Sequence, residues 1–345
     1  MLTQLGKHIV YNIAKSTMSE ENMPLVDMPL EELLEYKGIN PCPKDFDLYW
    51  EKALKELEEQ PPDYELVEEQ TTYKGVKLFH LYFTGVQKAR IHCKFMLPEH
   101  IEGKIPAIAM FHGYQSHCGD WFEKLPYVYN GFAVCAMDAR GQSGLSDDNL
   151  IVCGNTARGQ IVRGVTEQDP HKLLFRNIFL DTVQLVRVLE SMDFIDSNRI
   201  GATGASQGGA LTIACAALNP QIKVAVPAMP FLSDYKRVWE MDLSNEEEPY
   251  RELYTYFRMI DPLHEKEEEF WTRLGYIDIQ NLANRIKAKC LMFTGLLDKI
   301  CPVSTQFAAY NKITAQKELK VYPEFAHELY PRQNDITLDF FIKNL

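Results

Sequence analysis

Features that would point to nucleic acids or membranes are missing from this chain of 345 residues. Its formal net charge is −12 at pH 7 and basic clusters are absent, which argues against nucleic acid as a partner. No apolar run is long enough to cross a membrane, and Lys7, His8 and Asn12 interrupt the apolar residues near the N-terminus well short of a signal-peptide core. We therefore expect a cytoplasmic protein with neither a nucleic-acid nor a membrane partner.

Paired Cys-x-x-Cys spacing is also missing, although the chain contains eight cysteines. They stand at positions 42, 93, 118, 135, 153, 215, 290 and 301, several of them within apolar runs. We interpret them as reduced core residues rather than as metal ligands or a disulfide framework. The sequence accordingly predicts no metal site and no cofactor.

Internal repeats and low-complexity linkers are absent as well. With 46% hydrophobic and 24% charged residues, the composition suits one large α/β domain. We expect it to span residues 23–345, with a polar, aromatic and charged insertion at about 233–276. Residues 1–22 precede it and space their apolar side chains like one helical face. Three interpretations of this extension stay open: an upstream start or disordered extension, which we favour, a docking helix for a partner subunit, and a membrane-surface or targeting helix.

Alternation of strand-like and helix-like segments indicates an α/β fold with a mostly parallel sheet and helices on both faces. An antiparallel region is expected within residues 64–97. Asp45 is the expected N-cap of the second helix. We predict helices at residues 30–36, 46–57, 175–189 and 210–218, and buried strands at 105–111, 132–137, 199–203, 290–295 and 319–323.

The motif Gly204-Ala205-Ser206-Gln207-Gly208-Gly209 lies between a strand-like run and a helix-like run. A serine at such a tight turn is held in a strained backbone conformation, which only small neighbours permit. The bare Gly-x-Ser-x-Gly pattern also occurs in ordinary glycine-rich turns, but the strand and helix around it favour a nucleophile. We therefore predict Ser206 as the nucleophile.

A serine hydroxyl is a weak nucleophile at neutral pH, so it needs a base and a group that orients the base. In folds built around such a turn the chain order is Ser, then Asp or Glu, then His, and after Ser206 only His264 and His327 qualify. His264 lies in a charged segment typical of a solvated helix face. His327 follows the strand-like residues 319–323 on a short loop, where catalytic residues at strand ends belong. We predict His327 as the base.

The acid should also follow a strand. Asp298 comes shortly after the apolar run 290–295, and its place in the chain order favours it over an ordinary helix cap or turn aspartate. Asp261 and Asp278 are competitors, but neither follows a comparable run. We predict that Asp298 orients His327.

Oxyanion stabilisation requires N–H donors near the nucleophile. The backbone N–H of Gln207, directly after Ser206, is one candidate, and the N–H of Tyr114, after the strand-like residues 105–111, is the other. We expect His112, beside Gly113, to brace this loop through hydrogen bonds.

Together these motifs resemble the acetyl xylan esterase and cephalosporin C deacetylase family of serine carbohydrate esterases, from about residue 28 to the C-terminus. Several longer stretches in the family's style lie between them, such as residues 230–235 and 304–311. The resemblance is carried by His112-Gly113-Tyr114, Arg140-Gly141-Gln142, Gly204-Ala205-Ser206-Gln207-Gly208-Gly209, Asp298 and His327-Glu328.

The resemblance implies an α/β-hydrolase fold and removal of small acyl groups, chiefly acetyl, from xylo-oligosaccharides and other small esters, including cephalosporin C. It also implies a homohexamer, with the insertion serving as a cap over the pocket and an oligomer contact. By the same resemblance Ser206, His327 and Asp298 form the triad, Tyr114 and Gln207 the oxyanion hole, and Arg140 and Gln142 a structural support. For the substrate pocket we expect Tyr114, Met229, Phe231, Ile300 and Cys301; the last two are equally well explained as filler beneath a loop.

Other functions remain open at this stage. A broad-specificity carboxylesterase or a peptidase of prolyl oligopeptidase type would use the same triad, although the chain has no region long enough for a propeller. A lipase lacks support because no long apolar lid is visible. A catalytically silent fold that only binds a ligand is disfavoured, because all three triad residues are present.

Overall fold

The computed structural model of the protein describes residues 26–152, 159–241 and 250–345. The predicted extension at 1–22 and Cys153 lie outside these residues. None of the helices described is long and apolar enough to span a membrane.

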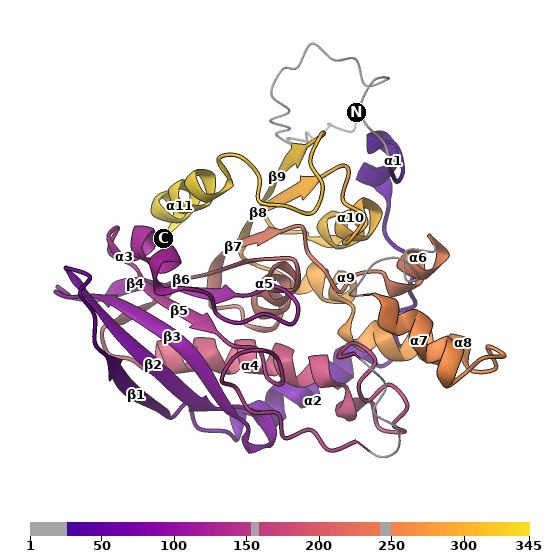
Figure 1. The fold of residues 1–345 in the computed structure, drawn as a ribbon, viewed down its shortest axis with the longest axis horizontal. Helices are drawn as coiled ribbons and strands as arrows, with labels where there is room; N and C mark the ends of the chain where they lie inside the picture. The colour runs from indigo at the N-terminus through magenta and orange to yellow at the C-terminus, as the bar shows by residue number, and fades with distance from the viewer. Residues whose placement is uncertain (1–25, 153–158, 242–249) are drawn as a thin grey trace, which may run out of the picture.

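A nine-stranded sheet runs through the described part of the chain in the order β1-β2-β3-β5-β4-β6-β7-β8-β9 (Figure 1). The first three strands pair antiparallel, β3 also pairs antiparallel with β5, and all pairs from β5 onward are parallel. The predicted mostly parallel sheet is confirmed. Its strands are β1 (Tyr64–Glu69), β2 (Val76–Thr84), β3 (Arg90–Pro98), β4 (Ile105–Phe111), β5 (Ala133–Met137), β6 (Ile195–Ala205), β7 (Ile222–Ala228), β8 (Lys289–Gly295) and β9 (Lys317–Tyr322).

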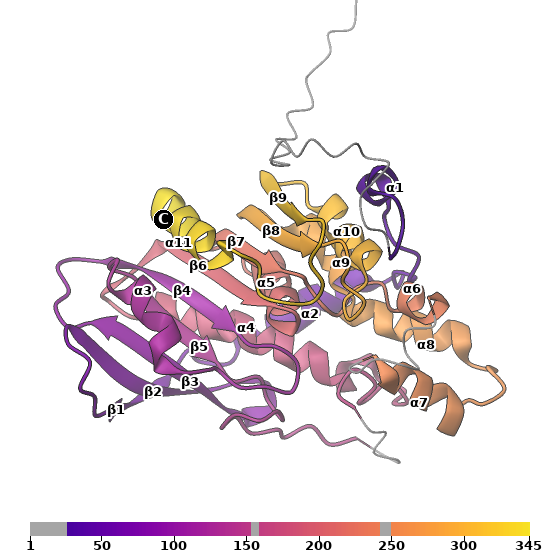
Figure 2. The same ribbon diagram turned by 45° about the horizontal axis from the view of Figure 1, so that its top comes forward.

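Helices cover both faces of this sheet, as Figures 1 and 2 show. Strand β4 illustrates the reason: Ala107 and Ala109 pack into one core cluster, whereas Ile108, pointing the other way, packs into a second. The first cluster includes α2 (Phe46–Glu58), α4 (Leu174–Glu190) and α5 (Gln207–Leu218), and the second includes α3 (Leu125–Val128) and α11 (Gln333–Asn344). A third cluster joins α1 (Leu30–Glu35) to α10 (Val303–Lys312).

The predicted insertion contains α6 (Tyr235–Glu240), α7 (Arg251–Met259) and α8 (Glu267–Leu274), followed by the short α9 (Ile279–Leu282). In both views α6, α7 and α8 lie together, far from the antiparallel strands (Figures 1 and 2). Their contacts are largely aromatic: the rings of Tyr256 and Phe270 stack 4.1 Å apart, and Trp239 and Phe257 lie 4.8 Å apart. These aromatic side chains belong to the first core cluster, so the insertion packs onto the main core and is not a separate unit.

Asp45 is the N-cap residue of α2, as predicted, but its side chain makes no capping hydrogen bond. Its carboxylate accepts a hydrogen bond of 2.5 Å from the Tyr276 hydroxyl instead. The prediction of Cys42 as a core residue is wrong, because Cys42 is exposed, whereas the other six described cysteines are buried as expected.

Candidate active site

Ser206 occupies the turn between β6 and α5 with φ 58° and ψ −121°, a conformation that is strained for any residue other than glycine. Its neighbours must be small. A Cβ atom on Gly204 would lie 2.5 Å from the Phe111 carbonyl oxygen, and one on Gly208 would lie 2.1 Å from the same oxygen. The turn thus lifts the Ser206 side chain to the carboxyl ends of the parallel strands.

His327 and Asp298 come from the loops after β9 and β8, and the His327 Nδ1 atom lies 2.8 Å from Asp298 Oδ2. Asp298 is 1% exposed, and its other oxygen accepts the N–H groups of Ile300 at 2.9 Å and Cys301 at 2.8 Å. The Gln306 amide also donates to Oδ2, at 3.0 Å. These donors hold the carboxylate in place against His327, whose Nδ1 donates to it and whose Nε2 is thereby left as the acceptor.

Cys301 lies close to both this pair and the serine. Its sulfur lies within 4.8 Å of a carboxylate oxygen of Asp298 and a ring nitrogen of His327, and its thiol interacts with the Ser206 hydroxyl. Burial raises the pKa of the Cys301 thiol, so the sulfur stays protonated and is not itself a nucleophile. Across the described residues no hydrogen bond joins Ser206 directly to His327. Catalytic hydrogen bonds are often long or poorly aligned in structures without substrate.

The two predicted oxyanion donors follow the ends of the neighbouring strands β4 and β6. Gln207 is the first residue of α5, so its N–H has no acceptor within the helix, and Tyr114 follows β4 at the same edge of the sheet. The Gln142 side chain is held by two hydrogen bonds: its amide donates to Gln207 Oε1 at 2.7 Å, and its Oε1 accepts the Gln115 N–H at 2.8 Å. Gln142 therefore links the loop after β4 to the start of α5.

The sequence profile of the acetyl xylan esterase (AXE1) family matches residues 23–345. The chain belongs to the acetyl xylan esterase family. This family is one of carboxylic ester hydrolases, and the predicted resemblance is confirmed.

Individual proteins that are similar to this chain are also acetyl esterases. Acetyl esterase Axe7A of Xylanibacter ruminicola is 26% identical over 298 residues, which are 83% of this chain and 63% of that protein. The chain thus spans less than two thirds of that relative. The crystal structure of acetyl xylan esterase 1 from Thermoanaerobacterium sp. JW/SL YS485 is 50% identical with a TM-score of 0.89, covering 92% of this chain and 99% of that one.

A second solved structure, the acetyl xylan esterase from Paenibacillus sp. R4, is 33% identical with a TM-score of 0.87 and covers 92% of this chain and 100% of that one. An acylaminoacyl peptidase from Pyrococcus horikoshii shares the fold at 18% identity and a TM-score of 0.58, with 79% of this chain and 42% of that one covered. The α/β-hydrolase fold of this acetyl xylan esterase family member is therefore established.

Around the centre of this family member, Arg140 and His112 brace the loops. Arg140 donates to both oxygens of Asp181 on α4 at 2.6 Å and to the Val86 carbonyl at 3.1 Å, and it is fully buried. His112 Nδ1 lies 2.7 Å from the Gly113 oxygen, while its Nε2 accepts the Ala139 N–H at 2.9 Å. Burial lowers the pKa of His112, so it remains a neutral brace.

Of the predicted pocket residues, Phe231 and Tyr114 lie side by side, with ring centroids 5.4 Å apart. Met229 is buried with its sulfur 3.9 Å from the Tyr330 hydroxyl. A cavity of about 600 Å³ runs past Gly204 and Ala205, but none of the predicted pocket residues is among those that line it. The assignment of a substrate pocket to these residues remains a prediction.

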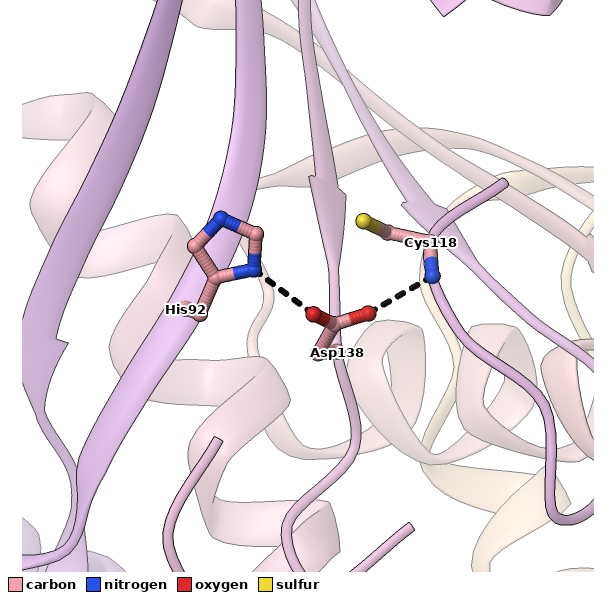
Figure 3. A group of neighbouring side chains, drawn as sticks. All are labelled: His92, Cys118 and Asp138. Carbon is pink, nitrogen blue, oxygen red and sulfur yellow. Dashed lines mark hydrogen bonds and ion pairs between the residues drawn. The ribbon is translucent and has the colours of Figure 1, made fainter. Parts of the chain in front are cut away.

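Sequence reasoning missed a buried cluster of His92, Cys118 and Asp138 (Figure 3). One Asp138 oxygen lies 2.6 Å from His92 Nδ1 and the other accepts the Cys118 N–H at 2.6 Å. His92 Nε2 is engaged by His80 Nδ1 at 2.7 Å, and burial raises the pKa of Cys118 to about 12. The cluster has the composition of a Cys-His-Asp triad, but its thiol is protonated and its imidazole has no free nitrogen.

The hydrogen bonds of the cluster instead hold the surrounding loops in place. Asp138 Oδ2 also accepts the Leu145 N–H at 2.9 Å, and the Ser146 hydroxyl donates to the Asp138 carbonyl at 2.7 Å. These bonds close the loop that begins at Arg140 and carries Gln142. The only sequence signal was the place of Asp138 directly after a buried strand, because His92 and Cys118 approach it only in the folded sheet.

Proposed function

We propose that this chain is a serine esterase that removes acetyl groups from acetylated xylo-oligosaccharides and other small acetyl esters, including those of the cephalosporin C type. The observation that carries the proposal is the 2.8 Å contact between His327 Nδ1 and Asp298 Oδ2, beside a serine held at φ 58°. A base fixed in this tautomer, near a strand-end serine hydroxyl, is the arrangement that acyl transfer requires.

The proposed reaction has two acyl-transfer steps. In the first, Ser206 Oγ attacks the acetyl carbonyl carbon while His327 Nε2 takes the hydroxyl proton, and Asp298 stabilises the resulting imidazolium. The N–H groups of Tyr114 and Gln207 donate to the oxyanion of the tetrahedral intermediate. His327 then returns the proton to the leaving alcohol oxygen, and the C–O bond to the alcohol breaks. In the second step water attacks the acetyl-enzyme in the same way and releases acetate.

The substrate class is supported by family membership and by two solved relatives, both acetyl xylan esterases, that each match 92% of this chain. If the buried Cys301 and Phe231 border the acyl pocket, as proposed, a group as small as acetyl would suit the site. A peptidase function is disfavoured, because the peptidase match is 18% identical and carries only the fold.

We test the proposal with purified protein and p-nitrophenyl acetate. The wild type should hydrolyse the ester and be labelled covalently by a fluorophosphonate, and Ser206→Ala should lose both properties. A panel of acetylated xylo-oligosaccharides, monosaccharide acetates, cephalosporin C and a p-nitroanilide peptide then separates the substrate classes. Turnover of the peptide anilide above the acetyl esters would refute the acetyl esterase assignment.

We also propose a cytoplasmic homohexamer. The assembly is proposed by resemblance to the family, and the location is supported by the six buried thiols, which suit a reducing compartment. Light scattering coupled to gel filtration should give about six times the 39.8 kDa chain mass. A monomeric mass over the micromolar range would contradict the assembly.

A further inference from the structure

The Tyr114 side chain extends away from its own backbone into the insertion. Its hydroxyl donates a short hydrogen bond to Glu252 Oε1 on α7 and accepts the Gln160 N–H at 3.0 Å. Its ring lies between Phe231, with centroids 5.4 Å apart, and Phe175, 6.5 Å away. Tyr114 is thus held at both ends, by β4 through its backbone and by α7 through its hydroxyl.

Among the glutamates of the insertion that the structure describes, Glu252 is unusual because it is buried, with 5% of its surface exposed. Its second oxygen accepts the Val162 N–H at 2.9 Å. Space around the carboxylate is closed, since a Cβ on Gly159, where φ is +125°, would lie 2.3 Å from Oε2. Three segments that are remote in sequence, the loop after β4, residues 159–162 and α7, therefore meet at this single carboxylate.

We propose that Glu252 is a positioning residue for the oxyanion hole: through the Tyr114 hydroxyl it fixes the loop whose N–H group receives the negative charge of the tetrahedral intermediate. The inference rests on the proposed esterase function and deepens it. Oxyanion donors are effective only when they are aimed before charge develops, and displacement of one donor lowers kcat by about a hundredfold to a thousandfold. The insertion thereby becomes part of the catalytic apparatus.

The groups facing the carboxylate are suited to its ionised form. The Tyr114 hydroxyl and the backbone N–H groups of Gln160, Ile161 and Val162 are all donors, so an acceptor-only carboxylate satisfies them together. Burial nevertheless raises the pKa of Glu252 to about 7. The titratable groups that face it are Tyr114 and Tyr235, and both are neutral at this pH because burial raises the pKa of each phenol. Proton uptake by Glu252 should therefore disturb the Tyr114 anchor near neutral pH.

The test compares Glu252→Gln and Tyr114→Phe, which act on the two sides of one hydrogen bond, with Asp261→Asn as the matched control. Asp261 is a buried carboxylate of the same insertion that accepts the N–H groups of Glu265 and Lys266 at 2.9 Å. Because none of its hydrogen bonds involves Tyr114, its loss should leave turnover within about twofold. Two readouts are used: kcat and KM for p-nitrophenyl acetate, and the rate of Ser206 labelling by a fluorophosphonate.

We expect kcat and the labelling rate to fall at least about tenfold in Glu252→Gln and in Tyr114→Phe, with KM changed less than about threefold. The double variant should be no less active than the less active of the two single variants. The acidic limb of the wild-type kcat profile near pH 7 should also change shape in Glu252→Gln. Labelling within twofold of wild type in both single variants, or an equal loss in Asp261→Asn, would overturn the positioning role. A wild type that is labelled but does not hydrolyse acetyl esters would refute the proposed function alone, because the labelling comparison still decides the inference. A wild type that is neither labelled nor active would overturn both.

Discussion

Arg140 and Asp181 form a bidentate ion pair that is closed to solvent: the guanidinium Nε and Nη2 each lie 2.6 Å from one carboxylate oxygen, and both side chains are 0% exposed. The pair joins the loop after β5 to α4. Gly85 leaves room for it, since a Cβ there would lie 2.3 Å from Asp181 Oδ1. The loop that carries Gln142 is therefore fixed at its root by two charges that cannot be hydrated.

Arg140→Met should lower the free energy of unfolding by about 3–5 kcal/mol, because it leaves a carboxylate buried without its partner. The double variant Arg140→Met/Asp181→Leu should be less destabilised than the single one. As a control, Arg90→Met breaks the exposed pair with Glu65 and should change stability by about 1 kcal/mol or less. Urea unfolding followed by circular dichroism measures all three. Equal losses at Arg140 and Arg90 would contradict this account.

Asp298→Asn should lower kcat for p-nitrophenyl acetate by about three to four orders of magnitude, because an amide no longer fixes the proton on His327 Nδ1. The fold should persist, since the asparagine side-chain oxygen still accepts the N–H groups of Ile300 and Cys301. Glu324→Gln, an exposed carboxylate on the His327 loop, serves as the control and should keep full activity. A harmless Asp298→Asn would disprove the assignment of the acid.

Gln207→Ala should keep much of the activity, because the proposed donor is its backbone N–H and not its side chain. A loss of a few fold is expected, since the side chain pairs with Gln142 at 2.7 Å. Gln142→Ala should show the same loss, and the double variant should add nothing further, as expected for partners in one hydrogen bond. Steady-state kinetics at one pH suffice. Losses that multiply would show that the two amides act separately.

Stability should fall as the pH rises through the range between about 4 and 7, in part because of Asp278. Burial and the nearby Asp234 carboxylate raise the pKa of Asp278 to about 7, so the folded protein holds a proton that the unfolded chain has released at its ordinary pKa of 3.8. The unfolded state is then favoured increasingly with pH until both forms are ionised. Asp278→Asn should reduce the difference in unfolding free energy between pH 5 and pH 8, a comparison made by urea titration. Part of the difference between pH 5 and pH 8 should remain in this variant, because burial also raises the pKa of Glu252 to about 7.

Much of the fold could be predicted because each buried strand is a short apolar run that ends in a turn. Strand β4 matches the predicted residues 105–111, and α2 ends within one residue of the predicted 46–57. The candidate triad could be predicted as well, since its order along the chain and its strand-end positions are properties of the sequence. The strands follow from local patterns, whereas the catalytic roles of the three residues stay predictions.

Contacts between distant segments could not be predicted. Asp45 has the residue type and position of a helix cap, but Tyr276, which is 231 residues away, engages its carboxylate. Glu252 lies in a charged helix of the insertion and gives no sign of burial, because Tyr114 and Val162 reach it only in the folded protein. A hydrogen bond of this kind leaves no periodic pattern in the sequence.

Ribosomes add the three proposed triad residues in the order Ser206, Asp298 and His327, with the imidazole arriving after the strand β9. Until that loop docks beside Asp298, the serine alcohol is no more reactive than any other. A growing chain is therefore protected from acylating itself on esters that it meets during synthesis. A chain in which this loop has not yet docked has no base for Ser206 and should therefore resist acylation.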